Sequence, residues 1–258
     1  MHTHTLKIKT ILFSLILTCT ALTGCSESDI NTYINDIASM TSEITSEITS
    51  ESDTTAKTSM SNTDIPKYTG NAYVEINNNK PTFTNDEITT TSFESYSDLD
   101  ELGRCGIAEA CIGTDIMPTE KRGQIGQIKP SGWHTVKYPE YISDNYLYNR
   151  CHLIGYQLTG ENANEKNLIT GTRYLNVTGM LPFENEVADY IKETNNHVMY
   201  RVTPLFVNDE LVARGVYIEA YSVEDDGSGV SYNIYCFNIQ PHITIDYATG
   251  DSYVTKEQ

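Results

Sequence analysis

The sequence predicts an α+β fold built on antiparallel strands. Its C-terminal third holds three segments rich in Val, Ile, Tyr and Phe, at 198–207, 211–223 and 230–239. Two polar, turn-forming stretches separate them, at 208–210 and 225–229, so we expect an antiparallel meander. Just before the meander, the apolar spacing changes from that of strands to that of a helix. A helix followed by a run of neighbouring strands is typical of α+β proteins rather than of alternating βαβ units.

The predicted helix covers residues 182–195. Pro182 suits its first turn, where a missing N–H group costs nothing. Three apolar residues recur at i, i+4 and i+8 and give the helix one apolar face: Phe183, Val187 and Ile191. Upstream, 147–154 and 167–170 have the length and composition of short strands. The predicted order is therefore two strands, one helix and a meander.

The chain is strongly acidic, with 35 Asp and Glu against 17 Lys and Arg and a net charge of −18. This balance argues against a protein that coats nucleic acid through a broad basic surface. Residues 121–176 differ from the rest, because they hold seven basic residues and four acidic ones. A basic island in an acidic chain indicates a local cleft for an anion.

The N-terminus predicts export. Lys7 and Lys9 precede an apolar run at 11–22, which is too short to span a bilayer and fits the hydrophobic region of a signal peptide. The run ends in Leu22-Thr23-Gly24-Cys25, which resembles the lipobox of bacterial lipoproteins. That resemblance implies a signal peptide at 1–24, a lipidated Cys25 and a position at the cell membrane, lipid-anchored on the extracellular face. An ordinary signal peptide followed by an incidental cysteine is the alternative.

Residues 25–65 form a Ser/Thr-rich acidic segment. So few apolar residues cannot offset the entropy lost on ordering a chain, and we interpret the segment as a solvated tether. Ile and Met at intervals leave a weak amphipathic helix as the alternative. The folded domain is predicted at 66–258, which is long enough to bury a core.

Beyond the predicted signal peptide and Cys25, four cysteines remain: Cys105, Cys111, Cys151 and Cys236. Export would place them in oxidising surroundings, and four cysteines allow three pairings. We expect Cys105 and Cys111 to form a disulfide, because both lie in the short segment 103–113. Cys151 and Cys236 are left unpaired, with a bridge between them as the alternative. The lack of paired C-x-x-C spacing argues against a structural zinc site.

The basic segment contains a motif with specific spacing. Asn149-Arg150-Cys151-His152 is followed by Asn167, by Asn176 nine residues later and by Glu184 after eight more. This pattern resembles the signature of the DNA/RNA non-specific endonucleases, the ββα-metal or His-Me finger nucleases, in which D-R-G-H precedes two Asn and a Glu. The runs at 148–158 and 126–133 are similar to the Gram-positive DNA-entry and streptodornase-like branch. The resemblance covers about 103–252 and implies a ββα-metal core with a central antiparallel sheet flanked by helices.

The resemblance also implies how the motif works on a phosphodiester. His152 would be the general base, since a neutral imidazole accepts a proton near neutral pH. Asn176 would be the lone protein ligand of a hydrated Mg²⁺ ion, with Mn²⁺ able to substitute, because a hard cation prefers oxygen ligands and Mg²⁺ keeps several waters. Glu184 would hold metal-bound waters.

Three further residues complete the predicted site. Arg150 would neutralise phosphate charge, Asn167 would order the site, and Arg122 is a looser candidate for a second phosphate clamp. Structural alternatives exist, because an Asn can cap a helix and an acidic residue in a first helical turn gains from the helix dipole. The combined spacing favours the catalytic interpretation.

Two positions depart from the signature. Asn149 replaces its Asp and removes a carboxylate that positions neighbouring groups, whereas Cys151 replaces its Gly and adds a side chain beside the predicted base. Both changes are tolerated in the branch that the chain resembles, and we retain the catalytic prediction.

The sequence thus predicts a secreted, membrane-tethered, metal-dependent endonuclease that hydrolyses DNA with little sequence specificity. The expected partners are DNA, with RNA left open, and the membrane through Cys25, and no protein partner is inferred. One alternative is a surface receptor that binds nucleic acid without cutting it, and another is a nuclease that prefers RNA. A receptor would require a broad basic face and would not require His152 together with Asn176.

Overall fold

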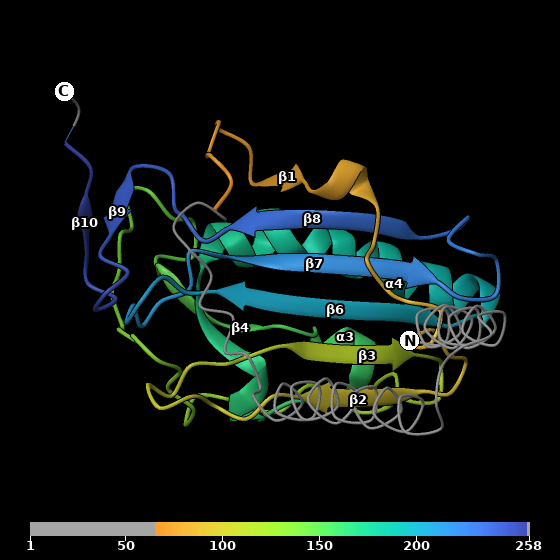
Figure 1. Cartoon of the computed structure of the whole chain (residues 1–258). Helices are drawn as coiled ribbons and strands as arrows, with labels where there is room; N and C mark the ends of the chain where they lie inside the picture. The colour runs from red at the N-terminus through yellow and green to blue at the C-terminus, as the bar shows by residue number, and fades with distance from the viewer. Residues whose placement is uncertain (1–64, 257–258) are drawn as a thin grey trace, which may run out of the picture. The chain divides into compact units, whose positions relative to one another are not determined.

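The computed structural model describes residues 65–256, and their centre is a six-stranded antiparallel sheet with the order β1-β8-β7-β6-β3-β2 (Figure 1). The strands are β1 Tyr73–Glu75, β2 Phe93–Tyr96, β3 Ala108–Ile112, β6 Val198–Leu205, β7 Gly215–Ser222 and β8 Ser231–Phe237. The α+β prediction is confirmed.

The meander predicted from the C-terminal third forms the middle of this sheet. β6, β7 and β8 pair in sequence order, with Val202 opposite Ile218 and Ile218 opposite Ile234. All three of these side chains are buried, and they belong to one large apolar core. Each strand is shorter than its predicted segment because the segment ends turn away into loops. The three N-terminal strands were not predicted.

A strand–strand–helix unit precedes the meander. β4 (Tyr148–His152) and β5 (Leu168–Thr172) form a separate antiparallel pair. Two short turns, α3 (Tyr156–Thr159) and η3 (Glu165–Asn167), lie between them. After β5 the chain enters the π-helical turn η4 (Leu175–Met180) and continues into α4 (Leu181–Thr194). The predicted strands at 147–154 and 167–170 and the predicted helix at 182–195 are confirmed.

α4 packs against one face of the six-stranded sheet, behind β7 and β8 in Figure 1. Its buried residues Val187, Ala188 and Ile191 join the apolar core. A Pro in the first turn and Asn195 in the left-handed conformation (φ 60°) mark its two ends, as expected for a helix start and a C-terminal cap.

Part of the opposite face of the sheet is covered by an extended segment of the chain. This segment follows β1 and contains only the short η2 turn (Asn77–Asn79). The Thr82 N–H donates to Glu219 Oε1 at 2.8 Å, and the Phe83 ring lies 4.4 Å from the Arg201 guanidinium. A second strand pair, β9 (Ile243–Ile245) with β10 (Ser252–Val254), ends the described chain.

The predicted disulfide between Cys105 and Cys111 is wrong. Both are free, buried thiols, as are Cys151 and Cys236. Cys111 lies in β3, and the chain back toward Cys105 is extended. An extended chain advances by about 3.3 Å per residue, so the two Cα atoms lie much further apart than the roughly 7 Å that a disulfide allows. Each thiol instead donates to backbone carbonyls, Cys105 to Leu168 and Cys111 to Thr89.

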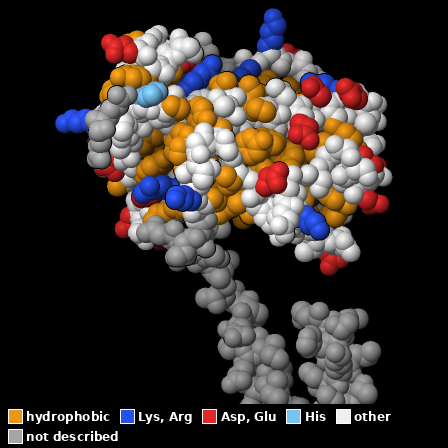
Figure 2. Space-filling view, turned by 90° about the horizontal axis from the view of Figure 1, so that it is seen from above, with side chains coloured by type: hydrophobic (Ala, Val, Ile, Leu, Met, Phe, Trp, Pro, Cys, Tyr) orange, Lys and Arg blue, Asp and Glu red, His pale blue; other side chains and the backbone are white. Residues whose placement is uncertain are grey.

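The surface seen from above in Figure 2 carries Lys and Arg side chains scattered among acidic and apolar ones, without a broad basic tract. Among residues 65–256 no helix is both long enough and apolar enough to cross a membrane. The predicted signal peptide (1–24) and nearly all of the predicted tether (25–65) lie outside the described residues, and the proposed limits 66–258 for the folded domain stay a prediction.

Candidate active site

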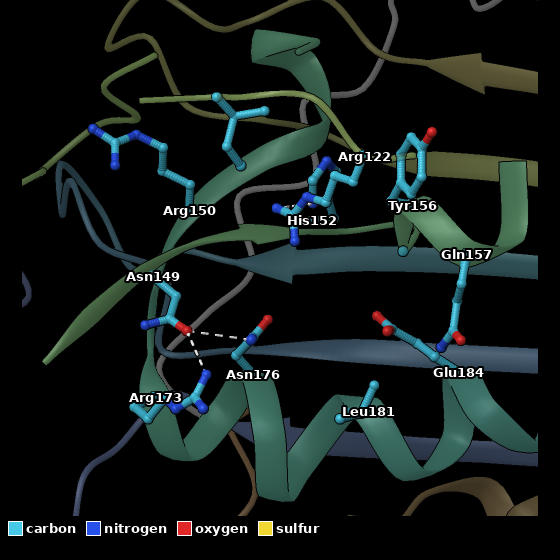
Figure 3. Close-up of a pocket in the computed structure, with 12 residues that line it drawn as sticks. Arg122, Asn149, Arg150, His152, Tyr156, Gln157, Arg173, Asn176, Leu181 and Glu184 are labelled. Atoms are coloured by element: carbon cyan, nitrogen blue, oxygen red, sulfur yellow. Dashed lines mark hydrogen bonds between the residues drawn. The ribbon is translucent and has the colours of Figure 1, made fainter. Parts of the chain in front are cut away.

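A cleft of about 480 Å³ lies where β4, α3 and the start of α4 meet the loop around Arg122 (Figure 3). Twelve residues line it: Arg122, Ile125, Asn149, Arg150, His152, Gly155, Tyr156, Gln157, Arg173, Asn176, Leu181 and Glu184. Five of the six site residues predicted from the sequence are therefore brought together. The sixth, Asn167, is buried and bonded to the turn that follows His152.

His152 ends β4 and is only 6% exposed. Its Nε2 lies 2.8 Å from the Asn162 carbonyl oxygen. A carbonyl can only accept a hydrogen bond, so Nε2 carries the proton and Nδ1 is the free base. Arg122 Nη2, which can only donate, lies 3.3 Å from Nδ1. Burial, reinforced by the positive charge of Arg122, lowers the pKa of His152 to about 4 against the opposing effect of the Asn162 carbonyl.

Asn176 projects into the same cleft from η4, the π-helical turn that joins β5 to α4. π-helical turns are rare and occur frequently at functional sites. The Asn176 carboxamide contacts β4 at both ends: Nδ2 donates to Asn149 Oδ1 at 3.3 Å, and Oδ1 accepts from Cys151 Sγ at 3.1 Å. Figure 3 shows Asn176 and Glu184 at separate points of the helical segment η4–α4, both directed into the cleft.

Glu184 occupies the first turn of α4 and is half-buried. Burial raises the pKa of its carboxyl to about 7, while Arg122 and Gln157 act in the opposite direction. Gly155 makes room for this carboxylate, because a Cβ at position 155 would lie 2.7 Å from Glu184 Oε2. The lack of a side chain at position 155 therefore leaves the space that the Glu184 carboxylate occupies.

The donors in the cleft suit a hard, hydrated cation. Asn176 offers an amide oxygen and Glu184 a carboxylate, which are the oxygen ligands that Mg²⁺ uses. Among the described residues there is no group of three or more His, Cys, Asp and Glu that could enclose a metal ion. Burial raises the pKa of the Cys151 thiol well above its usual value, so it is a poor thiolate ligand. The set fits an ion that keeps most of its ligands as water.

Residues 83–224, more than half of the chain, match the DNA/RNA non-specific endonuclease family. The chain belongs to this family. A protein from Streptococcus dysgalactiae subsp. equisimilis named deoxyribonuclease is 33% identical over 121 residues, which make up 45% of this chain and 35% of that protein. The chain thus matches about a third of the length of this curated relative.

Two solved structures show the same fold as this nuclease domain. NucA from Streptococcus agalactiae, with a magnesium ion bound, superposes with a TM-score of 0.65 and 26% identity over 74% of this chain and 91% of that one. Sda1 nuclease, with a bound zinc ion, gives a TM-score of 0.59 and 25% identity over 72% of this chain and 97% of that one.

In the nuclease domain, Arg150 is engaged with the loop that borders the cleft. Its Nη2 donates to the Gly126 carbonyl at 2.7 Å and its Nε donates to the Ile128 carbonyl. The guanidinium also lies 4.0 Å from the centre of the Trp133 ring. These contacts hold the loop in place, and a direct role of Arg150 toward phosphate stays a prediction.

Asn167 hydrogen-bonds the backbone that directly follows β4. It is fully buried, its Oδ1 accepts from the Ile154 N–H at 2.9 Å, and its Nδ2 donates to the Ile154 carbonyl at 3.0 Å. One side chain thereby satisfies both backbone groups of the second residue after His152. Asn167 thus reaches the site only through the backbone, and its role in ordering the site stays a prediction.

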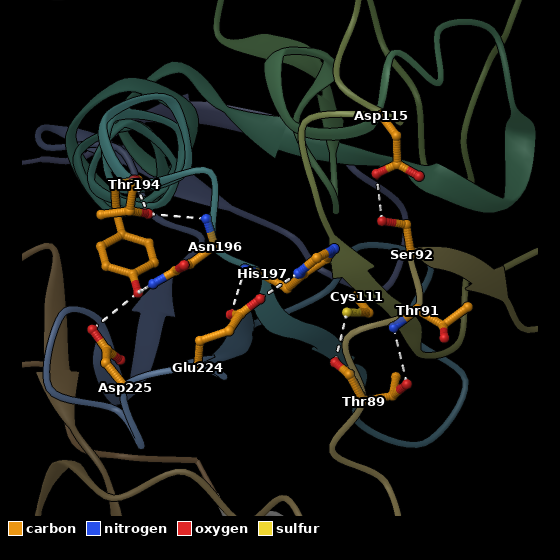
Figure 4. A network of polar contacts seen from close by, with 11 residues as sticks. Thr89, Thr91, Ser92, Cys111, Asp115, Thr194, Asn196, His197, Glu224 and Asp225 are labelled. Atoms are coloured by element: carbon orange, nitrogen blue, oxygen red, sulfur yellow. Dashed lines mark hydrogen bonds and ion pairs between the residues drawn. The ribbon is translucent and has the colours of Figure 1, made fainter.

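Sequence reasoning missed two polar residues that touch Asn176 or its neighbours, Asn149 and Arg173. Asn149 had been noted only as a departure from the family signature, and nothing in the spacing marked Arg173. The other histidines of the described chain form separate contacts. His197 pairs with Glu224 at 2.6 Å (Figure 4), and His134 lies 3.1 Å from the Thr249 carbonyl oxygen.

Proposed function

We propose that this chain is an endonuclease that hydrolyses phosphodiester bonds of DNA with little sequence specificity, using a divalent cation, Mg²⁺, for which Mn²⁺ can substitute. The observation that carries the proposal is the pairing of His152, fixed with Nδ1 unprotonated, and Asn176, with its amide oxygen in the same cleft. Family membership supports the reaction class, and the bound magnesium of NucA supports the choice of metal.

His152 acts as the general base in this proposal. Nδ1 takes a proton from the attacking water while Nε2–H stays bonded to the Asn162 carbonyl. Arg122 is exposed and donates to Nδ1. A phosphate is a stronger partner for a guanidinium than a neutral imidazole is. A bound substrate would therefore draw Arg122 onto phosphate, free Nδ1 and remove a charge that lowers the pKa of His152.

Asn176 holds the cation and Glu184 orients its water ligands. When bound, the cation supplies positive charge that stabilises the developing charge on phosphate and on the leaving oxygen. Glu184 has a pKa of about 7 through burial, and a neighbouring cation favours its carboxylate form. Three basic side chains line the cleft, Arg122, Arg150 and Arg173, and Arg122 lies against His152.

The cleft residues address phosphate and cation rather than the sugar, so we include RNA as a second substrate. A receptor that binds without cutting would require neither the fixed tautomer of His152 nor the oriented amide of Asn176.

We also propose that the protein is secreted and anchored to the membrane through lipidated Cys25. Cys25→Ala should abolish partitioning into a detergent phase, and unchanged partitioning would exclude lipid as the anchor.

The function is tested with supercoiled plasmid and purified protein in Mg²⁺ or EDTA. We expect short fragments only in Mg²⁺, and loss of cleavage in His152→Gly under the same conditions. An RNA substrate run in parallel reports the second activity. Cleavage by the parent that persists in EDTA would exclude the proposed cation chemistry, whereas plasmid binding without cleavage in Mg²⁺ would favour the receptor.

A further inference from the structure

The two departures from the family signature, Asn149 and Cys151, touch the same side chain. Strand residues two apart point to the same side, so β4 presents Asn149 and Cys151 together and Arg150 and His152 on its other side. Asn149 Oδ1 lies 3.3 Å from Asn176 Nδ2, and Cys151 Sγ lies 3.1 Å from Asn176 Oδ1. The carboxamide of Asn176 is therefore held from both ends by the two unusual residues.

A chain of one-way hydrogen bonds fixes the direction of this amide. Asp144 accepts from Arg173, whose Nε lies 3.0 Å from Asp144 Oδ2. Arg173 can only donate, and its Nη1 donates to Asn149 Oδ1 at 3.3 Å. Asn149 must therefore present its oxygen, not its NH₂ group, to Arg173. Figure 3 shows this oxygen shared between Arg173 and Asn176.

The same polarity passes on to Asn176. The Asn149 oxygen requires a donor opposite it, so Asn176 must turn its NH₂ group toward Asn149. Its oxygen then points the other way. A flipped amide would place two oxygens against each other at Asn149 and would turn a donor, its NH₂ group, toward the Cys151 thiol.

Cys151 has the space to make its contact because of Gly171. Cys151 is 1% exposed, and a Cβ at position 171 would lie 2.6 Å from the Cys151 Cβ. Gly171 lies opposite Asn149 in the β4–β5 register. The bare backbone of β5 thus accommodates the side chain that replaces the glycine of the signature.

We infer that Arg173, Asn149 and Cys151 are positioning residues that orient the Asn176 carboxamide with its oxygen available to the cation. The inference rests on the proposed function, in which Asn176 is the ligand of that cation. The acceptor at position 149 and the donor at position 151 are the required features. The negative charge of an Asp at position 149 is dispensable, because Arg173 and Asn176 both donate to a neutral amide oxygen.

The test is the affinity of the full chain for Mn²⁺ in the absence of nucleic acid, measured by calorimetric titration. Asn149→Leu and Arg173→Met should weaken binding by about 10- to 100-fold, as is usual for residues that hold a metal ligand. Cys151→Ala should weaken it by about 2- to 10-fold, the effect of one neutral hydrogen bond. Circular dichroism and melting temperature establish that each variant is folded.

Conservative variants separate orientation from mere packing. Asn149→Asp keeps the acceptor and Cys151→Ser keeps the donor. The affinity of both variants for Mn²⁺ should therefore stay within about threefold of the parent's, a smaller change than the loss expected when a partner is missing. Asn196→Ala serves as a matched control, because Asn196 donates to the Tyr190 hydroxyl near the end of α4 and has no contact with Asn176.

The outcomes distinguish this inference from the proposed function. If Asn176→Ala weakens Mn²⁺ binding but folded Asn149→Leu and Cys151→Ala do not, the inference is overturned and the function stands. Equal loss in Asn149→Asp and Asn149→Leu would also overturn it, since the acceptor would then not matter. If the parent binds no Mn²⁺, or Asn176→Ala binds it as the parent does, the cation site and the inference both fail.

Discussion

His152 is held as a neutral ring by partners that the sequence motif does not contain. The motif predicts a histidine of ordinary pKa, whereas the structure buries the ring between the Asn162 carbonyl and Arg122 and lowers its pKa to about 4. The sequence predicted six site residues, and five of them line one cleft. Asn162 could not be predicted, because it contributes only a backbone oxygen that any residue would supply.

The depressed pKa of His152 gives an activity prediction. His152→Gly should lose about 10²–10⁴ in rate, and free imidazole should restore part of it. Imidazole titrates near the ordinary histidine value of about 6.5, so the rescued rate should fall between pH 7 and 5.5. At saturating Mg²⁺ the parent kcat/KM should hold over that range, because a base with a pKa of about 4 stays neutral there and the neighbouring cation keeps the Glu184 carboxylate ionised. Asn176→Ala should be inactive at either pH and should not respond to imidazole.

The outcome that contradicts this prediction is imidazole rescue of Asn176→Ala, or near-full activity of His152→Gly. Either result would move the proton transfer to another group. A parent rate that halves near pH 6.5 at saturating Mg²⁺, where the cation favours the Glu184 carboxylate, would instead show that the ring is not buried as a neutral base.

The Gly155→Ala variant tests the position of the Glu184 carboxylate without changing the stability of the fold. The Gly155 φ of −58° is open to any residue, so Gly155→Ala brings no backbone strain. The added Cβ would approach the Glu184 carboxylate to 2.7 Å and displace it. We expect a melting temperature close to that of the parent and a loss of cleavage of about tenfold or more, as for a displaced group that orients metal ligands. An active Gly155→Ala variant would show that the carboxylate position is not critical.

The strand–strand–helix unit was predictable in outline, and its details were not. β4, β5 and α4 follow from short apolar segments and from the i, i+4, i+8 spacing that starts at Phe183. The π-helical turn η4 has no comparable signal, because it depends on how β5 and α4 are joined. β1, β2 and β3 are only three to five residues long, which is too short for a clear local periodicity, and β1 and β3 also pair with strands of the C-terminal third.

Asn167 gives a prediction at the scale of the β4–β5 connection. Asn167→Ala leaves the Ile154 N–H and carbonyl without their partners in a buried position. Each unsatisfied buried group costs about 1–3 kcal/mol, so urea unfolding should show a loss of several kcal/mol together with lower activity. Asn167→Asp would set a carboxylate oxygen against the Ile154 carbonyl in a buried position and should be at least as damaging to folding. Full stability in Asn167→Ala would mean that this bonding does not hold the connection.

For the molecule as a whole, the net charge says little about the cleft, and the local charge of one segment says more. The net charge of −18 argued against a broad basic surface, and the view in Figure 2 shows none on that face. The basic surplus at 121–176 correctly located the cleft, because Arg122, Arg150 and Arg173 all line it. The predicted disulfide between Cys105 and Cys111 was wrong because residues that are close in sequence can lie far apart in space when the chain between them is extended.

Burial of a neutral histidine also makes the stability of the molecule depend on pH. A ring whose pKa falls from 6.5 to about 4 on folding binds protons more tightly when unfolded. Its contribution is fully present above pH 6.5 and is lost as the pH falls toward 4, a total of about 3 kcal/mol at 1.4 kcal/mol per pKa unit. His152→Gln cannot be protonated, so it should lack this loss. The shift of Glu184 has the opposite sign and cancels from the comparison because both proteins contain it.

Urea denaturation of the parent and of His152→Gln at several pH values between 7 and 4.5, in EDTA, measures the difference directly. The parent should lose stability relative to the variant as the pH falls, with most of the change complete by pH 4.5. His134→Gln is the matched control, because the His134 side chain is 46% exposed, and its curve should run parallel to that of the parent. If the parent and His152→Gln also run parallel, the ring does not enter the folded state as a buried neutral base, and its assigned tautomer loses its physical ground.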